Sequence, residues 1–255
     1  MKTLGIDLAA DPKRTAAAVI EWRKGQAQLV HLALGVTDKT VVELFGASDV
    51  TGIDCPLGWP HPFLSFLLGH SRNDPDAVLR HDGLAGRREL AYRATDRFVT
   101  HQTGLIPLSV SADRLAHPAM RCAVIQAKIA RASGIQPRDG TGRLIEVYPA
   151  ASLRIWGISA RRYKGRGTPE SEIRYNILGQ LTTAAPWLDF DAYRDQLIAS
   201  DDLLDSVIAS LTARAAANQA TLLPGPDQDL AAREEGWIHL PTGALTELNK
   251  IGRLL

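Results

Sequence analysis

Two acidic residues end two short apolar segments that share the same three-residue sequence. Gly5-Ile6-Asp7 closes the first segment, and Gly52-Ile53-Asp54 closes a later one. If the segments are parallel neighbours in a sheet, their backbones lie about 4.8 Å apart, and both carboxylates point into one small volume. Two like charges so close either share a proton, which raises one pKa, or bind a cation. We therefore expect a functional pair at the carboxyl ends of two strands, where α/β sheets bind ligands.

Further acids extend this pair to a candidate metal centre. Glu146 lies between apolar neighbours, and Asp202 and Asp205 are spaced i, i+3 on one face of a helical segment. Oxygen ligands of this kind suit Mg²⁺ or Mn²⁺ rather than zinc or copper. Two such ions roughly 4 Å apart activate a water and stabilise the leaving oxygen of a phosphodiester. We predict that Asp7, Asp54 and Asp205 bind metal, and that the catalytic set is Asp7, Asp54, Glu146, Asp202 and Asp205.

These acids also have structural alternatives. Asp202 suits the first turn of a helix, where the dipole favours negative charge. Asp7 alone would bond to the turn that follows it, and a buried ion pair with an arginine explains Glu146 equally well. Asp205 lies beside an apolar helical stripe, which favours a metal or a hydrogen-bond partner over solvation.

The N-terminal region that positions the first acids is expected to be rich in strands. Residues 3–7, 15–22 and 28–36 predict three antiparallel strands, because a hairpin-like turn separates the last two. A helix capped by Asp38 is expected over 39–45, followed by a strand over 50–55. A strand, a helix and a strand in succession favour a parallel return beside an earlier strand.

The rest of the chain is expected to be mostly helical. Helices are predicted over 86–100 and 119–133, a strand over 143–148, further helices from 150 onward, and a final helix over 201–218. The tail is expected to form a turn and a short covering strand. Since no linker is visible, we predict one domain over residues 1–255 with a mostly helical insertion at about 56–142.

Composition excludes several classes of protein. The chain has 255 residues, 29 Lys plus Arg against 28 Asp plus Glu, and 45% hydrophobic residues, which excludes a polybasic tail and intrinsic disorder. The two cysteines form no C-x-x-C pair, so a reducing cytoplasmic location is expected. No segment approaches the roughly 20 apolar residues of a membrane span, and no signal-peptide core is present. P-loop and dinucleotide-binding glycine motifs are absent from the sequence.

A basic segment with aromatic residues follows Glu146. No acid occurs between Glu146 and Glu170, whereas Trp156 and Tyr163 lie among basic side chains. Such a segment binds phosphates in a salt-dependent way and stacks bases, but a solvated loop with a core tryptophan explains it equally well. The predicted substrate contacts, with one from a second basic patch, are Arg93, Arg154, Arg161, Arg162 and Lys164.

Six motifs, taken in order, resemble one known family. They are Gly5-Ile6-Asp7, Gly52-Ile53-Asp54-Cys55-Pro56-Leu57-Gly58, Tyr92-Arg93-Ala94-Thr95-Asp96, Glu146-Val147-Tyr148-Pro149-Ala150, Asp202-Leu203-Leu204-Asp205-Ser206 and Glu235-Gly236-Trp237-Ile238. Together they resemble the family of predicted nucleases with an RNase H fold, domain of unknown function 429, over nearly the whole chain.

The resemblance implies an α/β fold and a site. The implied sheet is mixed, has five strands in the order 3-2-1-4-5, and is flanked by helices. Its strands one and four are parallel neighbours. The implied active centre takes acids from these two strands and from the last helix. Holliday junction resolvases are similar in this layout and offer acids at i, i+3 on the final helix, which correspond to Asp202 and Asp205 here.

These expectations lead to two functions of different classes. The first is a metal-dependent nuclease that hydrolyses phosphodiesters with Mg²⁺ or Mn²⁺. The second is a non-catalytic module of the same fold that binds nucleic acid or a nucleotide through its arginines. In both, the partner is a nucleic acid or a small phosphodiester and not a membrane. The helical insertion is placed where it could cap the acidic pocket and exclude a duplex.

Overall fold

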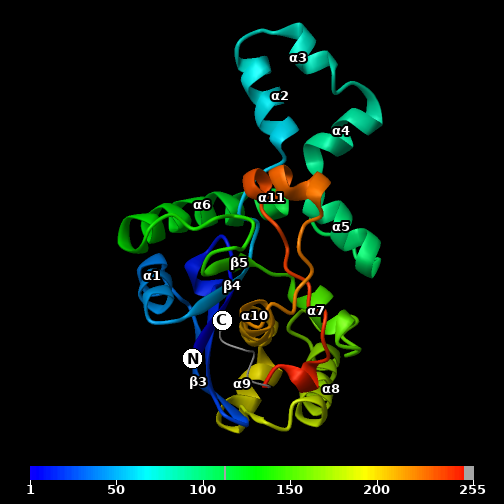
Figure 1. Cartoon of the computed structure of the whole chain (residues 1–255). Coiled ribbons are helices and arrows are strands. Elements are labelled where there is room, and N and C mark those ends of the chain that lie inside the picture. The colour runs from blue at the N-terminus through cyan, green and yellow to red at the C-terminus, as the bar shows by residue number, and fades with distance from the viewer. Residues whose placement is uncertain (112, 250–255) are drawn as a thin grey trace.

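A mixed sheet lies at the centre of the protein (Figure 1). In the computed structural model, which describes residues 1–111 and 113–249, six strands form this sheet in the order β5-β4-β1-β2-β3-β6. β2 runs antiparallel to both of its neighbours, and the other pairs are parallel. The strands are β1 (Lys2–Asp7), β2 (Ala16–Arg23), β3 (Gln26–Leu34), β4 (Val50–Asp54), β5 (Leu144–Glu146) and β6 (Leu188–Asp189).

The expected RNase H-like order of five strands is confirmed, with one correction. β6 adds a sixth strand at the edge, where Leu188 pairs with Ala27 of β3. A strand of two residues is too short to show the alternation by which strands are recognised in a sequence. The expected single domain over 1–255 includes residues 112 and 250–255, which lie outside the described part, and it stays a prediction.

Helices cover both faces of the sheet. One face carries α1 (Asp38–Gly46) and α6 (Asp113–Ser133), and the other carries α10 (Asp201–Ala217). α7 (Pro149–Ile155) and α9 (Arg194–Ala199) pack next to α10, and α8 (Thr168–Ala184) packs against α9. No helix among residues 1–111 and 113–249 combines the length and the apolar character needed to cross a membrane.

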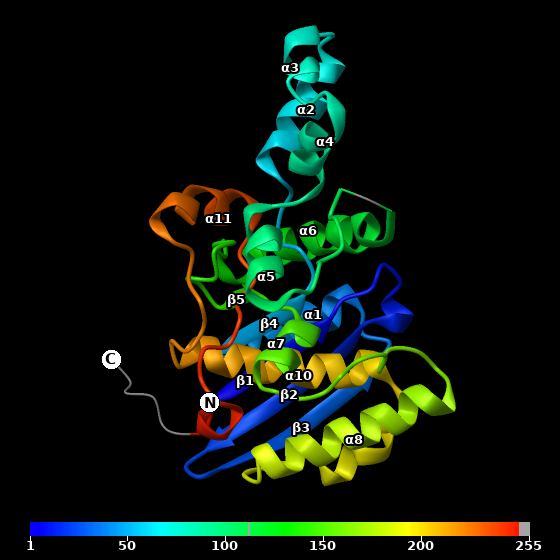
Figure 2. The same cartoon turned by 90° about the vertical axis from the view of Figure 1, so that its right-hand side faces the viewer.

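A group of helices from the insertion stands away from the sheet (Figure 1, Figure 2). It consists of α2 (His61–Ser71), α3 (Pro75–Leu79) and α4 (Gly83–Ala91), and the chain returns through α5 (Ala94–Thr103). The helix expected over 86–100 is therefore wrong as one element. The chain breaks at Tyr92 and Arg93, which have extended backbones between α4 and α5.

The remaining elements are short. α11 (Asp229–Glu235) packs near α2 and α5. Where a short covering strand was expected, Ile238 forms only an isolated bridge to Glu146. Single 3-10 turns occupy Pro12–Arg14, Asp191–Tyr193, Pro226–Gln228 and Leu245–Glu247. The cap of α1 is Thr37 rather than Asp38, because the carboxylate of Asp38 instead pairs with cations of α6.

The repeated glycines of the two Gly-Ile-Asp segments permit close contact between the sheet and α10. Gly5 and Gly52 pair in register, and a Cβ atom on Gly5 would lie 1.9 Å from the carbonyl oxygen of Ser206. A Cβ atom on Gly52 would lie 2.5 Å from the carbonyl oxygen of Ala209. These glycines thus let α10 cross directly over β1 and β4, which brings Asp205 close to the strand ends.

We expect Gly5→Ala to destabilise the protein by about 1–3 kcal/mol, because the added methyl group meets backbone atoms that cannot move away without displacing α10. The free energy of unfolding from urea titration measures the loss. Gly46→Ala is the matched control, since a Cβ atom added there would have no neighbouring atom within 4 Å. Equal stability of the two variants would contradict the close contact.

Candidate active site

The two acids of the Gly-Ile-Asp segments lie side by side at the base of a cavity. Asp7 pairs in register with Asp54 across the parallel strands β1 and β4. The cavity has a volume of about 340 Å³ and is lined by both acids, with Pro107, Leu108, Leu115, Tyr148 and Lys164 among the other residues. The predicted convergence of these two carboxylates is therefore present in the structure.

A larger cavity of about 710 Å³ lies nearby, beside Arg88, Tyr92 and Arg97. Its two buried acids, Asp96 and Glu235, already bind other groups of the protein. We therefore assign the chemistry to the smaller cavity, because two of its acids, Asp7 and Asp54, make no hydrogen bond or ion pair with the described residues.

The carboxylates of Asp7 and Asp54 are unpaired among the residues that the structure describes. Within the described residues, neither makes a side-chain hydrogen bond or an ion pair, and both side chains remain partly accessible. Burial, followed by the charges of Asp205 and Asp54, raises the pKa of Asp7 well above its usual value. Burial raises the pKa of Asp54 to about 7, although the Lys164 ammonium opposes the shift.

Asp205 of α10 lies close enough to Asp7 and Asp54 to influence their pKa values, although it does not line the cavity. Both of its oxygens are engaged. The Tyr163 hydroxyl donates to Oδ1 at 2.6 Å, and Nζ of Lys164 lies 2.7 Å from Oδ2. Burial and the charge of Asp205 raise the pKa of Tyr163, so that its hydroxyl keeps the proton it donates. Burial opposes the charge of Lys164, yet Asp205 and the neighbouring acids raise its pKa, so it stays an ammonium ion.

The other predicted helix acid, Asp202, lies at the rim. Its Oδ1 is 3.4 Å from a guanidinium nitrogen of Arg14, whose side chain is 60% exposed. Such an exposed pair contributes little to stability. Burial and then the charge of Asp201 raise the pKa of Asp202. Ser200 caps α10, because its hydroxyl accepts from the backbone N–H of Leu203.

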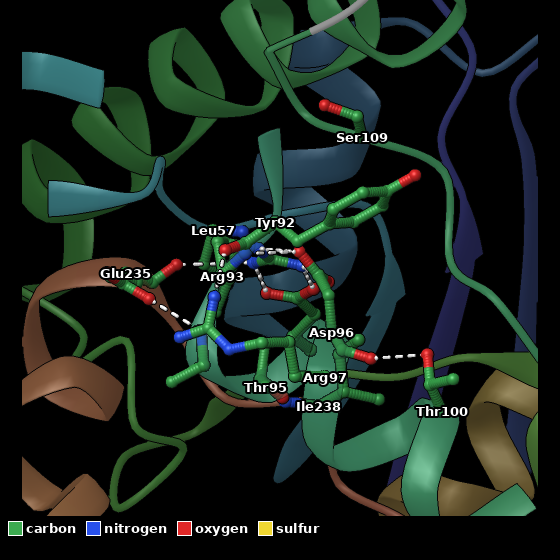
Figure 3. A network of polar contacts seen from close by, with 12 residues as sticks. Leu57, Tyr92, Arg93, Thr95, Asp96, Arg97, Thr100, Ser109, Glu235 and Ile238 are labelled. Atoms are coloured by element: carbon green, nitrogen blue, oxygen red, sulfur yellow. Dashed lines mark hydrogen bonds and ion pairs between the residues drawn. The ribbon is translucent and has the colours of Figure 1, made fainter. Parts of the chain in front are cut away.

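Glu146 forms the buried ion pair that the sequence left as its alternative role. Both of its oxygens accept from the Arg93 guanidinium, at 2.6 and 2.8 Å, and Oε2 also accepts from the backbone N–H of Leu57. Arg93 binds Asp96 as well, and Figure 3 shows it at the centre of this network. With a side chain only 2% exposed, Arg93 holds the cavity wall together, although it was predicted as a substrate contact.

Glu235, which the sequence analysis named only as part of a motif, binds the backbone at the base of the projecting helices. Its Oε1 accepts from the backbone N–H of His61, where α2 begins. Its Oε2 accepts from the backbone N–H of Ala94, where α5 begins. One carboxylate therefore holds both ends of the projecting group. No pattern in the sequence indicates this contact, because it joins three separate segments.

The basic segment divides into an exposed part and an inward part. Arg154, Arg161 and Arg162, which stay predicted phosphate contacts, are exposed, whereas Lys164 lines the cavity. Tyr163 is buried, and Trp156 packs partly against the core. Neither ring is therefore placed to stack on bases, and the interpretation of Trp156 as a core residue holds.

The loop that carries Lys164 is fixed by a residue that the sequence analysis missed. The buried Arg174 of α8 donates from Nη1 to the carbonyl oxygens of Tyr163 at 2.6 Å and Gly165 at 2.9 Å. Gly165 has a φ of +127°, and Arg162 has a φ of +63°, which is unusual for a residue with a side chain. The backbone on both sides of Lys164 is thus held in a defined and partly strained conformation.

The acids fit one hydrated divalent cation rather than two closely coordinated ions. Across residues 1–111 and 113–249, no three His, Cys, Asp or Glu side chains are grouped so that they could hold a metal ion. Mg²⁺ usually keeps several waters and binds one or two carboxylates together with substrate phosphates. Asp7 and Asp54 meet this need. Asp205, predicted as a third ligand, is occupied by Lys164 and Tyr163.

The sheet order and the acids at the ends of β1, β4 and near the start of α10 define an RNase H-like α/β protein with an acidic cavity. The family model described as "Protein of unknown function (DUF429)" matches residues 5–229, and the chain belongs to this family.

Comparison with other proteins adds little to this assignment. No curated protein matches the chain. Among solved structures, the chain is similar to T. thermophilus RuvC in complex with Holliday junction substrate, at 15% identity over 54% of this chain and 99% of that chain. The TM-score of 0.19 is too low for this likeness to support a conclusion about fold or function.

Proposed function

We propose that this protein hydrolyses a phosphodiester at Asp7 and Asp54 with one bound Mg²⁺ or Mn²⁺. The observation that carries the proposal is the pair of in-register carboxylates that lack any cation of their own within the described residues. Such a pair is unfavourable when both groups are ionised, unless a proton or a cation is shared between them.

The balance of charge around the cavity supports a divalent cation. Asp7, Asp54 and Asp205 have one ammonium group between them, that of Lys164. Arg93 pairs with both Glu146 and Asp96, so its positive charge is already balanced and does not neutralise Asp7 or Asp54. Negative charge therefore exceeds positive charge when the acids are ionised, and a divalent cation would neutralise the excess.

The residues of the cavity would bind and isolate the reacting phosphate. A bound divalent cation lowers the pKa of a coordinated water and polarises a phosphoryl oxygen. Asp7 and Asp54 would hold the cation, and Pro107, Leu108 and Tyr148 would exclude bulk water from it. Electrostatic interactions are stronger in such a site than in open solvent.

The size of the cavity favours a narrow substrate. Its volume of about 340 Å³ lies at the small end of ordinary ligand pockets. Pro107, Leu108 and Leu115 belong to the predicted insertion and form part of its lining. From this lining and volume we infer that a duplex would be too wide to reach the acids. We infer that the substrate enters as a strand end or as a small diester, with Arg154, Arg161 and Arg162 contacting phosphates outside.

Hydrolysis assays on substrates of different width test the proposal. Bis(p-nitrophenyl) phosphate, a dinucleotide, and single-stranded, duplex and branched DNA and RNA are incubated with Mn²⁺ or Mg²⁺. We expect turnover of the narrow substrates, and its loss in Asp7→Asn but not in Asp189→Asn, which removes an exposed acid at the end of β6. Activity that Asp7→Asn leaves unchanged would refute the mechanism.

One observation favours the second candidate, a non-catalytic binding module. Lys164 already neutralises Asp205, which leaves the described residues without a three-ligand metal site. A binding module would retain single-stranded nucleic acid without turnover, and its affinity would fall as salt rises. The same assays, run beside a binding titration at two salt concentrations, separate the two functions.

A further inference from the structure

Among the residues that the structure describes, two cations line the acidic cavity with Asp7 and Asp54. Arg93 is enclosed in a buried network of ion pairs, whereas Lys164 is not. Its Nζ lies 2.7 Å from Asp205 Oδ2 and 5.7 Å from the centre of the Tyr163 ring. Its side chain is nevertheless 50% exposed, unlike the fully enclosed guanidinium of Arg93. The ammonium group thus combines a fixed anchor with access to the cavity.

The ammonium group has donors left for another acceptor. A lysine carries three N–H donors. Among the described residues, Asp205 is the single hydrogen-bonding partner within ion-pair distance of Nζ. Phosphate oxygens in the cavity would accept from the remaining donors, and a lysine binds phosphate well as a point charge.

The surrounding structure holds Lys164 in this place from three sides. Arg174 fixes the carbonyl oxygens of the residues before and after Lys164. Tyr163 is anchored through its hydroxyl to Asp205, and the backbone N–H of Gly165 donates to Asp201. A lysine that merely covered an acid at the surface would not need a loop held so closely. This positioning is typical of a group whose location matters for chemistry.

A second cation in a phosphodiesterase site neutralises charge on the phosphate and the leaving oxygen. The position beside Asp205 is where the sequence predicted metal binding, and there the structure has an ammonium group instead. We infer that Lys164 takes the place of a second cation and contacts the reacting phosphate, so that the site needs one divalent ion. The inference rests on the proposed function for its reaction, but not for its contact with phosphate.

Two binding titrations test the inference without measuring turnover. Calorimetry with Mn²⁺ on the wild-type chain is expected to give one bound ion. Titration with thymidine 5′-monophosphate in EDTA is expected to show at least tenfold weaker binding by Lys164→Met, with most affinity retained in Lys164→Arg. Lys24→Met, in the exposed hairpin turn between β2 and β3, is the control and should bind like the wild type.

The outcomes separate the inference from the proposed function. Two Mn²⁺ ions in the wild type, or unchanged nucleotide binding by a folded Lys164→Met, would overturn the inference. If the wild type binds no Mn²⁺, the proposed function fails, and the nucleotide titration in EDTA alone decides whether Lys164 contacts phosphate. Thermal unfolding of each variant shows whether lost binding reflects lost structure, and in that case the comparison with Lys164→Arg decides.

Discussion

Asp54→Asn is expected to abolish phosphodiester hydrolysis and, in the absence of metal, to make the protein more stable. Hydrolysis should fall by about 10³-fold or more, because a neutral amide no longer helps Asp7 to hold a divalent cation. The Asn side chain has nearly the same size and stays in register with Asp7, so the fold is retained. A substitution that abolishes activity and raises stability indicates an acid whose role is catalytic rather than structural.

The gain in stability depends on pH in a defined direction. The pKa of Asp54 is raised from 3.8 to about 7 by burial, so the folded protein keeps a proton that the unfolded chain releases. Stability of the metal-free wild type therefore falls as pH rises from about 4 to about 7. Since asparagine does not titrate, the advantage of the variant grows over the same window. Allowing for partial solvent access, we expect an advantage on the order of 1–3 kcal/mol at pH 8.

Thermal unfolding at pH 5 and pH 8 in EDTA measures this effect. An advantage of 1–3 kcal/mol corresponds to a rise in Tm of several degrees, because each kcal/mol shifts Tm by about 2–4 °C at this size. In Mn²⁺ at 1,000 times its Kd the order should reverse, since a ligand at that concentration stabilises the wild type by about 4.1 kcal/mol. Asp189→Asn should show neither effect. If the stability of Asp54→Asn depended on pH as strongly as that of the wild type, Asp54 would not be the acid whose raised pKa lowers stability.

Local patterns in the sequence predicted the geometry of the first acid pair. The pairing of Asp7 with Asp54 agrees with short-range features, namely apolar segments that end in an acid, one intervening helix, and the right-handed crossover that connects parallel strands. That these two strands are neighbours was implied by the family resemblance. The glycines of the same segments served as markers of similarity, and their physical role emerged only with the position of α10. Close contact with Ser206 and Ala209 requires them.

The partners of the other acids could not be predicted, because they come from distant segments. Glu146 accepts from Arg93, which lies at the break between α4 and α5. The sequence pattern predicts one continuous helix there and therefore does not predict this pairing. Lys164 belongs to a basic run and was predicted to bind substrate, but its anchor on Asp205 depends on the clamp by Arg174 from the next helix. Neither contact leaves a periodic signal in the sequence.

Arg93→Met is expected to be the most destabilising single substitution near the cavity, with a loss of about 3–5 kcal/mol in the free energy of unfolding. Removal of the guanidinium leaves the carboxylates of Glu146 and Asp96 buried without their cation. It also removes the hydrogen bond to the carbonyl oxygen of Glu235, whose side chain fastens both ends of the projecting helices.

A double-mutant cycle separates the ion pair from simple loss of packing. Glu146→Gln alone also costs stability, whereas Arg93→Met combined with Glu146→Gln should cost less than the sum of the two, since the uncompensated charge is gone. Arg97→Met, on the exposed face of α5, is the matched control and should change stability by about 0.5 kcal/mol or less. Urea unfolding of the four proteins measures the coupling. Additive losses would show that Arg93 and Glu146 act independently. In that case the ion pair would not hold the cavity wall, and Glu146 would return to the set of acids available for catalysis.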